Sequence, residues 1–334
     1  MRSNTESLTI CALLTDRSDN IGIQMGKREE QSMKDYAICT DSCADLSHGM
    51  LTALDIKVIN LHILLNNQEY HYGTDDEEQR LKLFYGQLRQ EGTTSTSQVT
   101  PSEYRNMFFP LLAEGKDILY IGFSSGLSAT VDSARLAAKE LENDFPDRNI
   151  NVVDSLSASM GLGLLVWHAA MMREQGKSME DVTHWVEANK LSVMHLFTVD
   201  DLNFLKRGGR LSGRTAFVGT VLNIKPVLRF DDQGHMLMAY KVRGRRKCLL
   251  TMVDEMEKSA HKPQNQTIFI THGDCLADAQ FLAGEIRSRF GIKEIYINFV
   301  GPVIGGHSGP GTVALFYLAE DRNFERSKHK VNSI

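Results

Sequence analysis

The stretch that decides the fold is residues 117–126, DILYIGFSSG, in which an apolar run ends in a turn of serine and glycine. A short apolar run bounded by turn residues predicts a buried strand, here over 117–123. Apolar residues then recur at helical spacing over 127–142. A strand that passes through a short loop directly into a helix is the repeating unit of a parallel α/β sheet.

The same alternation extends to both sides of this unit. Residues 56–66 are followed by a turn at 66–68 that leads into 69–72, and Thr100-Pro101-Ser102-Glu103 is a capping box that opens a helix. Residues 92–100 have no periodicity and are expected to form a loop. The other expected elements are strands at 36–41, 56–66 and 150–154, a short helix after Ala44 and helices at 75–90 and 101–114.

The second half changes character and is expected to be mixed α+β. A buried helix over 157–175 begins it, and a hairpin turns at 232–234. The remaining expected elements are strands at 193–199, 225–230, 236–242, 267–271, 294–299 and 312–319, and helices from 178, at 245–260 and at 276–290. We therefore expect two domains, 36–156 and 157–322, with a disordered leader or an upstream start codon accounting for 1–32 and a tail at 323–334.

Composition narrows the class of protein. The chain has 334 residues and a formal net charge of -5, which is a poor match for nucleic acid. Its five cysteines lack a zinc-like spacing, no secretory signal is evident, and residues 155–172 are too short and polar for a membrane span. We expect a cytoplasmic protein with reduced thiols, no metal and no stable membrane insertion.

Three hydroxyl- and glycine-rich loops are the candidate functional segments. Residues 122–126 follow a strand and precede a helix, which is where open α/β sheets bind ligands and where backbone N–H groups favour an anion. Residues 96–101 offer neutral donors beside a second helix start, although a solvated hydrophilic loop has the same composition. Residues 301–311 contain five glycines and two prolines around His307 and Ser308, a frame in which a histidine favours ligand binding.

Two other interpretations remain open. Gly122-Phe123-Ser124-Ser125-Gly126 also matches the nucleophile elbow of serine hydrolases, with Ser124 as nucleophile and His307 as base, but no oxyanion segment precedes it. Basic clusters at 206–210 and 241–247 could bind phosphates or, less favoured, nucleic acid. No phosphate loop of the ATP-binding type is present.

Taken together, the motifs resemble those of the DegV family in order and spacing over residues 36–320. The matching segments are DSCAD (41–45), TSQVTP (96–101), SSGLSAT (124–130), Asp154-Ser155, LKRGGRLS (205–212), KPVL (225–228), KVRGRRK (241–247) and GPVIGGHSGPG (301–311). The resemblance implies a two-domain α/β protein that binds a long-chain fatty acid, with no cofactor and no complete active site of its own. It also implies that an ATP-dependent fatty acid kinase subunit is the partner.

By this resemblance, the carboxylate of the fatty acid is held by Thr96, by Ser124 or Ser125, and by His307. Arg243 would assist phosphoryl transfer or docking of the kinase. The energetics agree, because each buried methylene contributes about 0.8 kcal/mol, so a long acyl chain needs an enclosed apolar tunnel. A bare carboxylate is costly to bury, and several hydroxyls with a histidine are suitable partners for it.

Overall fold

The computed structural model describes residues 35–71, 76–210 and 223–322. Its first sheet is parallel throughout and has the strand order β2-β1-β6-β7, as the alternation of strands and helices predicts. These strands are β1 (Tyr36–Asp41), β2 (Ile56–Ile59), β6 (Asp117–Gly122) and β7 (Ile150–Asp154). The carboxyl ends of β1 and β6 therefore meet at one edge, where the loop after Gly122 begins.

The second sheet is mixed, which confirms the expected change of character in the second half. Its order is β10-β9-β8-β13-β11-β12, and β11–β12 is its one parallel pair in the described part of the chain. The strands are β8 (Val193–Thr198), β9 (Ile224–Phe230), β10 (Met236–Arg243), β11 (Ile268–His272), β12 (Ile295–Phe299) and β13 (Val313–Leu318). The turn between β9 and β10 lies at 231–235, as expected.

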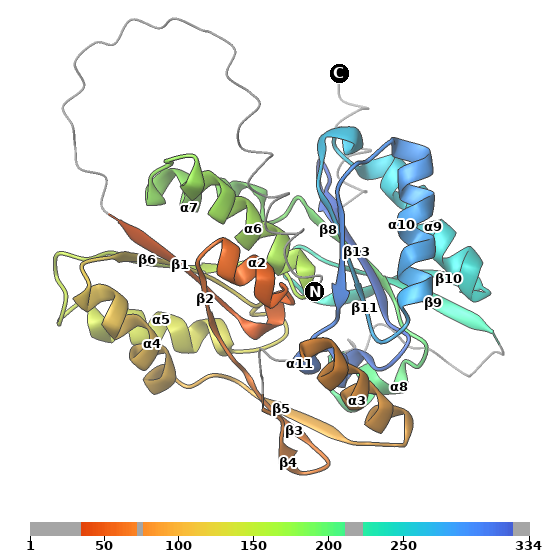
Figure 1. The fold of residues 1–334 in the computed structure, drawn as a ribbon, viewed down its shortest axis with the longest axis horizontal. Coiled ribbons are helices and arrows are strands. Elements are labelled where there is room, and N and C mark those ends of the chain that lie inside the picture. The colour runs from red at the N-terminus through yellow and green to blue at the C-terminus, as the bar shows by residue number, and fades with distance from the viewer. Residues whose placement is uncertain (1–34, 72–75, 211–222, 323–334) are drawn as a thin grey trace, which may run out of the picture. The chain divides into compact units, whose positions relative to one another are not determined.

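Helix α6 (Met160–Glu174) lies between the two sheets (Figure 1) and contacts β1 and β6 on one side and β8, β11 and β13 on the other. A helix that is apolar on all sides is buried on all sides. Helices α4 and α5 cover the outer face of the first sheet, and α9 and α10 cover the outer face of the second. The helices are α2 (His48–Ala53), α3 (Glu77–Arg89), α4 (Pro101–Ala113), α5 (Thr130–Leu141), α7 (Met179–Asn189), α8 (Asn203–Arg207), α9 (Arg245–Ser259), α10 (Leu276–Phe290) and α11 (Pro302–Ser308), with short 3-10 turns at Ser42–Ala44 and Pro263–Asn265.

A third, small sheet corrects two expectations. The expected strand over 56–66 divides at Asn60 and Leu61 into β2 and β3 (His62–Leu65), which belong to different sheets. The expected loop at 92–100 contains β5 (Thr94–Ser97), which pairs antiparallel with β3. β4 (Gln68–Glu69) pairs with the other edge of β3 through a turn whose Asn66 and Asn67 both have positive φ, a conformation that asparagine tolerates.

The glycine-rich segment at 301–311 was expected to be a loop throughout, and this is wrong for α11. Local cues elsewhere are confirmed: the Thr100–Glu103 capping box opens α4, and Ser178 caps α7. One hydrophobic core includes both Ile38 of the first sheet and Phe316 of the second, so the division into domains at 156–157 stays a prediction. The expected leader at 1–32 and tail at 323–334 lie outside the described residues.

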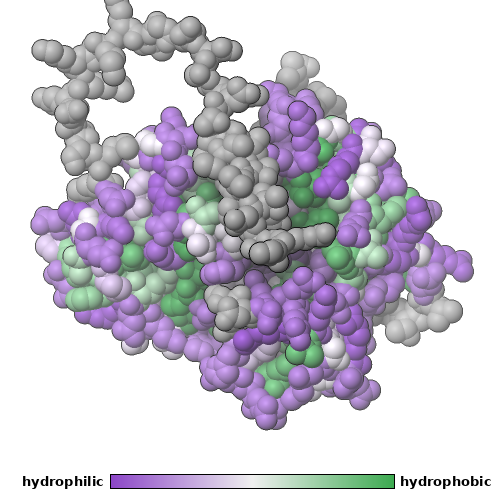
Figure 2. All heavy atoms as spheres, in the orientation of Figure 1, coloured by the Kyte–Doolittle hydropathy of each residue, from purple (hydrophilic) through white to green (hydrophobic). Residues whose placement is uncertain are grey.

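Hydrophilic side chains cover most of the face shown in Figure 2, with smaller hydrophobic areas between them. Among the described residues, no helix combines the length and apolar character that a bilayer crossing requires. Cys39, Cys43, Cys248 and Cys275 form no disulfide among the described residues, and Cys11 lies outside them.

Candidate functional site

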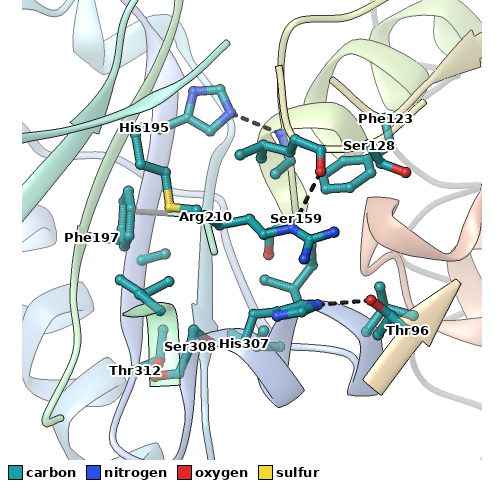
Figure 3. A pocket seen from close by; sticks show the side chains of 18 of the residues that line it. Thr96, Phe123, Ser128, Ser159, His195, Phe197, Arg210, His307, Ser308 and Thr312 are labelled. Atoms are coloured by element: carbon teal, nitrogen blue, oxygen red, sulfur yellow. Dashed lines mark hydrogen bonds between the residues drawn. The ribbon is translucent and has the colours of Figure 1, made fainter. Parts of the chain in front are cut away.

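A largely apolar cavity is lined by strands of the second sheet, by β5, by the loop after β6, by the residues just before α6, and by α8 and α11 (Figure 3). Its wall includes aromatic and aliphatic side chains from both halves of the chain. Prominent among them are Phe123, Phe197, Phe230, Met236, Ile304 and Phe316. The cavity can therefore hold a hydrocarbon group away from water.

Thr96 and His307 meet in the wall of this cavity. Thr96 Oγ1 and His307 Nε2 are 2.8 Å apart, and both residues line the cavity. Thr96 projects from β5 and His307 from the last turn of α11. The structure thus brings together two of the residues that the sequence predicts as ligands.

Close packing of α11 explains why its sequence is rich in glycine. A Cβ atom at Gly305 would lie 2.4 Å from Tyr85 Oη, and one at Gly306 would lie 2.9 Å from Thr94 Oγ1. Thr94 Oγ1 donates to the Gly306 carbonyl at 2.8 Å. Gly306 is the residue before His307, which Thr96 contacts. Residues two apart on a strand share a face, so β5 fixes two consecutive residues of α11.

Burial sets the charge of His307. It lowers the pKa of the imidazole to about 4, and the nearby guanidinium of Arg210 also lowers it. His307 is therefore neutral at pH 7, so it can donate only one ring N–H. Which nitrogen carries that proton depends on the tautomer.

Arg210 also lines the cavity and supplies a positive charge. Its side chain donates to the main-chain carbonyls of Leu127, at 3.4 Å, and Gly208. A guanidinium carries five N–H donors, so it can keep both bonds and still bind a carboxylate. We call Thr96, Arg210 and His307 the polar cluster.

Arg210 was not predicted as an individual site residue. It belongs to the basic cluster at 206–210, for which only phosphate binding or, less favoured, nucleic-acid binding was predicted. The signal was the pair of glycines before it: a Cβ at Gly208 would lie 2.2 Å from His307 Nδ1. Gly208 lets the chain pass directly against His307, and this close approach places Arg210 beside the imidazole.

Ser124 and Ser125 are placed differently from Thr96 and His307. Ser124 is fully buried, its Oγ donates to the Gly234 carbonyl at 3.1 Å, and it is not among the cavity-lining residues. Ser125 is exposed, and its backbone N–H donates to Asp154. From the same loop, Ser128 does line the cavity, and its hydroxyl contacts Thr130 Oγ1 at 2.9 Å. The carboxylate-binding role of the Ser124–Ser125 pair stays a prediction.

Arg243 is exposed at the end of β10 and does not line the cavity. Its neighbour Arg245 is instead held in place by Asp278, at 2.8 Å, and by the Gly311 carbonyl. Arg243 is therefore open to solvent as far as the described part of the chain shows. Leu211 and Ser212, the end of the other basic motif, lie outside the described residues.

The serine hydrolase alternative requires a hydrogen bond between nucleophile and base. Ser124 instead donates to Gly234, and the side chain bonded to His307 is Thr96. The structure does not bring the two proposed catalytic residues together. Within the described ranges, no three His, Cys, Asp or Glu side chains converge as a metal ion would need.

A buried carboxyl group lies behind the cavity wall. Asp45 Oδ2 accepts a hydrogen bond from Ser159 at 2.5 Å, and Ser159 Oγ lies 3.2 Å from Thr271 Oγ1. Ser159 and Thr271 line the apolar cavity, whereas Asp45 lines a second cavity beside it with His48 and Glu77. Burial raises the pKa of Asp45 to about 7, although the Ser159 hydrogen bond opposes this change.

The fold and the cavity together define an α/β protein with a largely apolar cavity and a small polar cluster in its wall. A family model described as an uncharacterised protein of the DegV family matches residues 35–320. The chain belongs to the DegV family. A DegV domain-containing protein of Clostridium perfringens is 43% identical over 290 residues, which cover 87% of this chain and 99% of the relative.

Solved structures show the same fold. A DegV family protein from Thermus thermophilus, described as binding fatty acid, is 29% identical, with a TM-score of 0.75 and coverage of 85% of this chain and 99% of that one. DegV from Bacillus subtilis, described as a fatty acid binding protein, is 27% identical, with a TM-score of 0.73 and coverage of 86% and 100%.

Proposed function

We propose that this chain binds a long-chain fatty acid in the apolar cavity and presents its carboxylate to a fatty acid kinase for acyl-phosphate formation. The observation that supports the proposal best is the polar cluster set into an otherwise apolar wall. The likeness to relatives described as binding fatty acid supports the ligand class.

The polar cluster suits a carboxylate. Arg210 supplies the countercharge, and both of its hydrogen-bond partners are main-chain carbonyls, so no acidic side chain of the described chain competes at those bonds. Thr96 Oγ1 can accept the N–H of His307 Nε2 and donate its own hydroxyl proton to the carboxylate, so the neutral pair supplies one donor to the ligand. A carboxylate with these donors avoids the cost of burying an unpaired charge.

The Ser124–Ser125 pair enters this proposal as a further carboxylate contact. Because the turn at Gly234 occupies the Ser124 hydroxyl, that contact requires the β9–β10 turn to move away. Kinase presentation rests on Arg243, which is exposed and available to a partner. The reaction would then use ATP held by the kinase, and we propose no cofactor for this chain.

The ligand is tested by extracting the purified protein under denaturing conditions and identifying released fatty acids by mass spectrometry. The delipidated protein is then titrated with hexadecanoic acid in a thermal unfolding assay. A ligand present at 100 times its Kd stabilises a protein by about 2.7 kcal/mol, so a clear rise in Tm is expected. An extract without fatty acid, together with an unchanged Tm, would refute the proposal.

A further inference from the structure

The hydroxyl of Ser308 is buried against the cavity without a hydrogen-bond partner. Ser308 lines the cavity, only 4% of its surface is exposed, and its Oγ has no partner among the described residues. Among the described residues, three other buried hydroxyl side chains line the cavity: Ser159, Thr271 and Thr312. Each of these three is bonded, so Ser308 differs from all of them.

The main chain holds Ser308 in place. Thr312 Oγ1 donates to the Ser308 carbonyl at 3.1 Å and to the Gly309 carbonyl at 2.8 Å. These bonds fix the end of α11 but leave the Ser308 Oγ unsatisfied. A buried hydroxyl without a hydrogen-bond partner is destabilising. A hydrocarbon chain lying against it would exclude water and offer no partner in its place.

Ser308 also lies close to the polar cluster. It directly follows His307, and the Cα atoms of neighbouring residues are about 3.8 Å apart. In Figure 3, Thr96 lies on one side of His307, and Ser308 and Thr312 lie on the other. A ligand atom that meets Ser308 Oγ therefore belongs to the part of the acyl chain next to the carboxyl group.

We propose that the cavity takes fatty acids that carry a hydroxyl group near the carboxyl end, at carbon 2 or 3, and that Ser308 recognises this hydroxyl. A ligand hydroxyl both donates and accepts, so it can satisfy Ser308 Oγ whichever way the serine proton points. A site built around a buried polar group discriminates against an analogue that lacks the matching group. This inference rests on the proposed function, because it assumes that the carboxylate lies at the polar cluster.

The test compares four ligands of one chain length on the delipidated full-length protein: hexadecanoic acid and its 2-hydroxy, 3-hydroxy and 16-hydroxy derivatives. Kd values are measured by competition against a fluorescent fatty acid. We expect the 2-hydroxy or the 3-hydroxy acid to bind about fivefold to tenfold more tightly than hexadecanoic acid, and the 16-hydroxy acid to gain nothing.

Ser308→Ala should abolish this preference, since it removes the partner of the ligand hydroxyl and leaves an apolar wall. The variant is expected to bind hexadecanoic acid at least as tightly as the wild type and to lose the preference for the hydroxy acids. Ser157→Ala is the matched control, because Ser157 Oγ is also buried without a partner but does not line the cavity. It should leave all four ratios unchanged.

The outcomes separate the two proposals. Tight binding of hexadecanoic acid without any preference for the 2- or 3-hydroxy acid overturns the role of Ser308 and leaves fatty acid binding intact. A Ser308→Ala variant that weakens all four acids equally also overturns it, because Ser308 would then contact the carboxylate. Failure of every acid to bind refutes the proposed function itself.

Discussion

Thr96 Oγ1 and His307 Nε2 lie 2.8 Å apart, although 211 positions separate the two residues in the chain. The contact joins the edge strand β5 to the end of α11, and both residues line the same cavity. Because burial keeps His307 neutral at pH 7, this contact is a hydrogen bond between uncharged groups. It therefore orients the imidazole without supplying charge to the site.

Thr96→Val should weaken fatty acid binding. Valine keeps the shape of threonine but removes the hydroxyl, so the ligand carboxylate and His307 each lose a partner. A neutral hydrogen bond contributes about 1 kcal/mol, so Kd is expected to rise about fivefold to tenfold. The measurement is competition against a fluorescent fatty acid. Ser95→Ala, on the exposed side of the same strand, is the control and should leave Kd unchanged.

Arg210→Gln should weaken binding more than Thr96→Val, because it removes the positive charge of the polar cluster. Hydrogen bonds to charged groups contribute about 1.5–3 kcal/mol, which corresponds to a rise in Kd of about tenfold to a hundredfold. Arg210→Lys should recover part of the affinity, since it restores the charge without the planar fork. An NMR titration gives an independent measurement: without Arg210 the pKa of His307 should rise. An unchanged Kd would exclude Arg210 from the carboxylate site.

Gly208→Ala should disturb the site without removing any polar group. The added Cβ would lie 2.2 Å from His307 Nδ1, so the imidazole must move and its contact with Thr96 is disturbed. Gly208 has a φ of -73°, so backbone strain does not contribute to the effect. We expect weaker fatty acid binding in the same competition assay. Gly284→Ala, in α10 with open space around it, is the control and should leave binding unaltered.

Local features of the structure followed from the sequence. Thr100 and Glu103 form a capping box from residues three apart, and the strand at 117–122 is bounded by its own turn residues. Such signals are contained within a few positions, so they can be recognised without knowledge of the neighbouring elements. The parallel first sheet followed in the same way from the alternation of strands and helices.

Features that depend on residues far away in the chain could not be predicted from the sequence. Thr94–Ser97 is a strand because β3 pairs with it, and α11 is a helix despite its glycines because Tyr85 and Thr94 pack against them. The same limit applies to the site. Ser124 was predicted to bind the ligand because it follows a strand. The turn containing Gly234 covers it, and that turn comes more than a hundred positions later in the chain.

Asp45→Asn should change how stability depends on pH. Burial raises the pKa of Asp45 to about 7 in the folded protein, whereas an unfolded aspartate has a pKa of about 3.9. The stability that comes from this higher pKa is present in full below about pH 4 and is lost as pH rises towards about 7. The folded and unfolded pKa values differ by about three, and each pKa unit corresponds to about 1.36 kcal/mol. The free energy of unfolding therefore falls by at most about 4 kcal/mol over this range.

Asparagine cannot ionise, so the Asp45→Asn variant should become more stable relative to the wild type as pH rises from 4 to 8. Urea unfolding at several pH values measures this difference. Asp55→Asn is the matched control with the opposite sign, because the hydrogen bond from Lys57 lowers the pKa of Asp55. A difference between wild type and Asp45→Asn that does not vary with pH would show that Asp45 is ionised in the fold.

Arg243→Ala should separate ligand binding from kinase presentation. Arg243 is exposed and does not line the cavity, so the Kd for fatty acid is expected to stay at the wild-type value. With a purified fatty acid kinase and ATP, the rate of acyl-phosphate formation should fall about tenfold or more, as expected when a charge-assisted contact to a partner or phosphate is lost. Lys247→Ala removes an exposed positive charge nearby and serves as the control for net charge. Equal rates for the two variants would mean that Arg243 has no special place in docking, and a changed Kd would mean that its effect passes through the cavity.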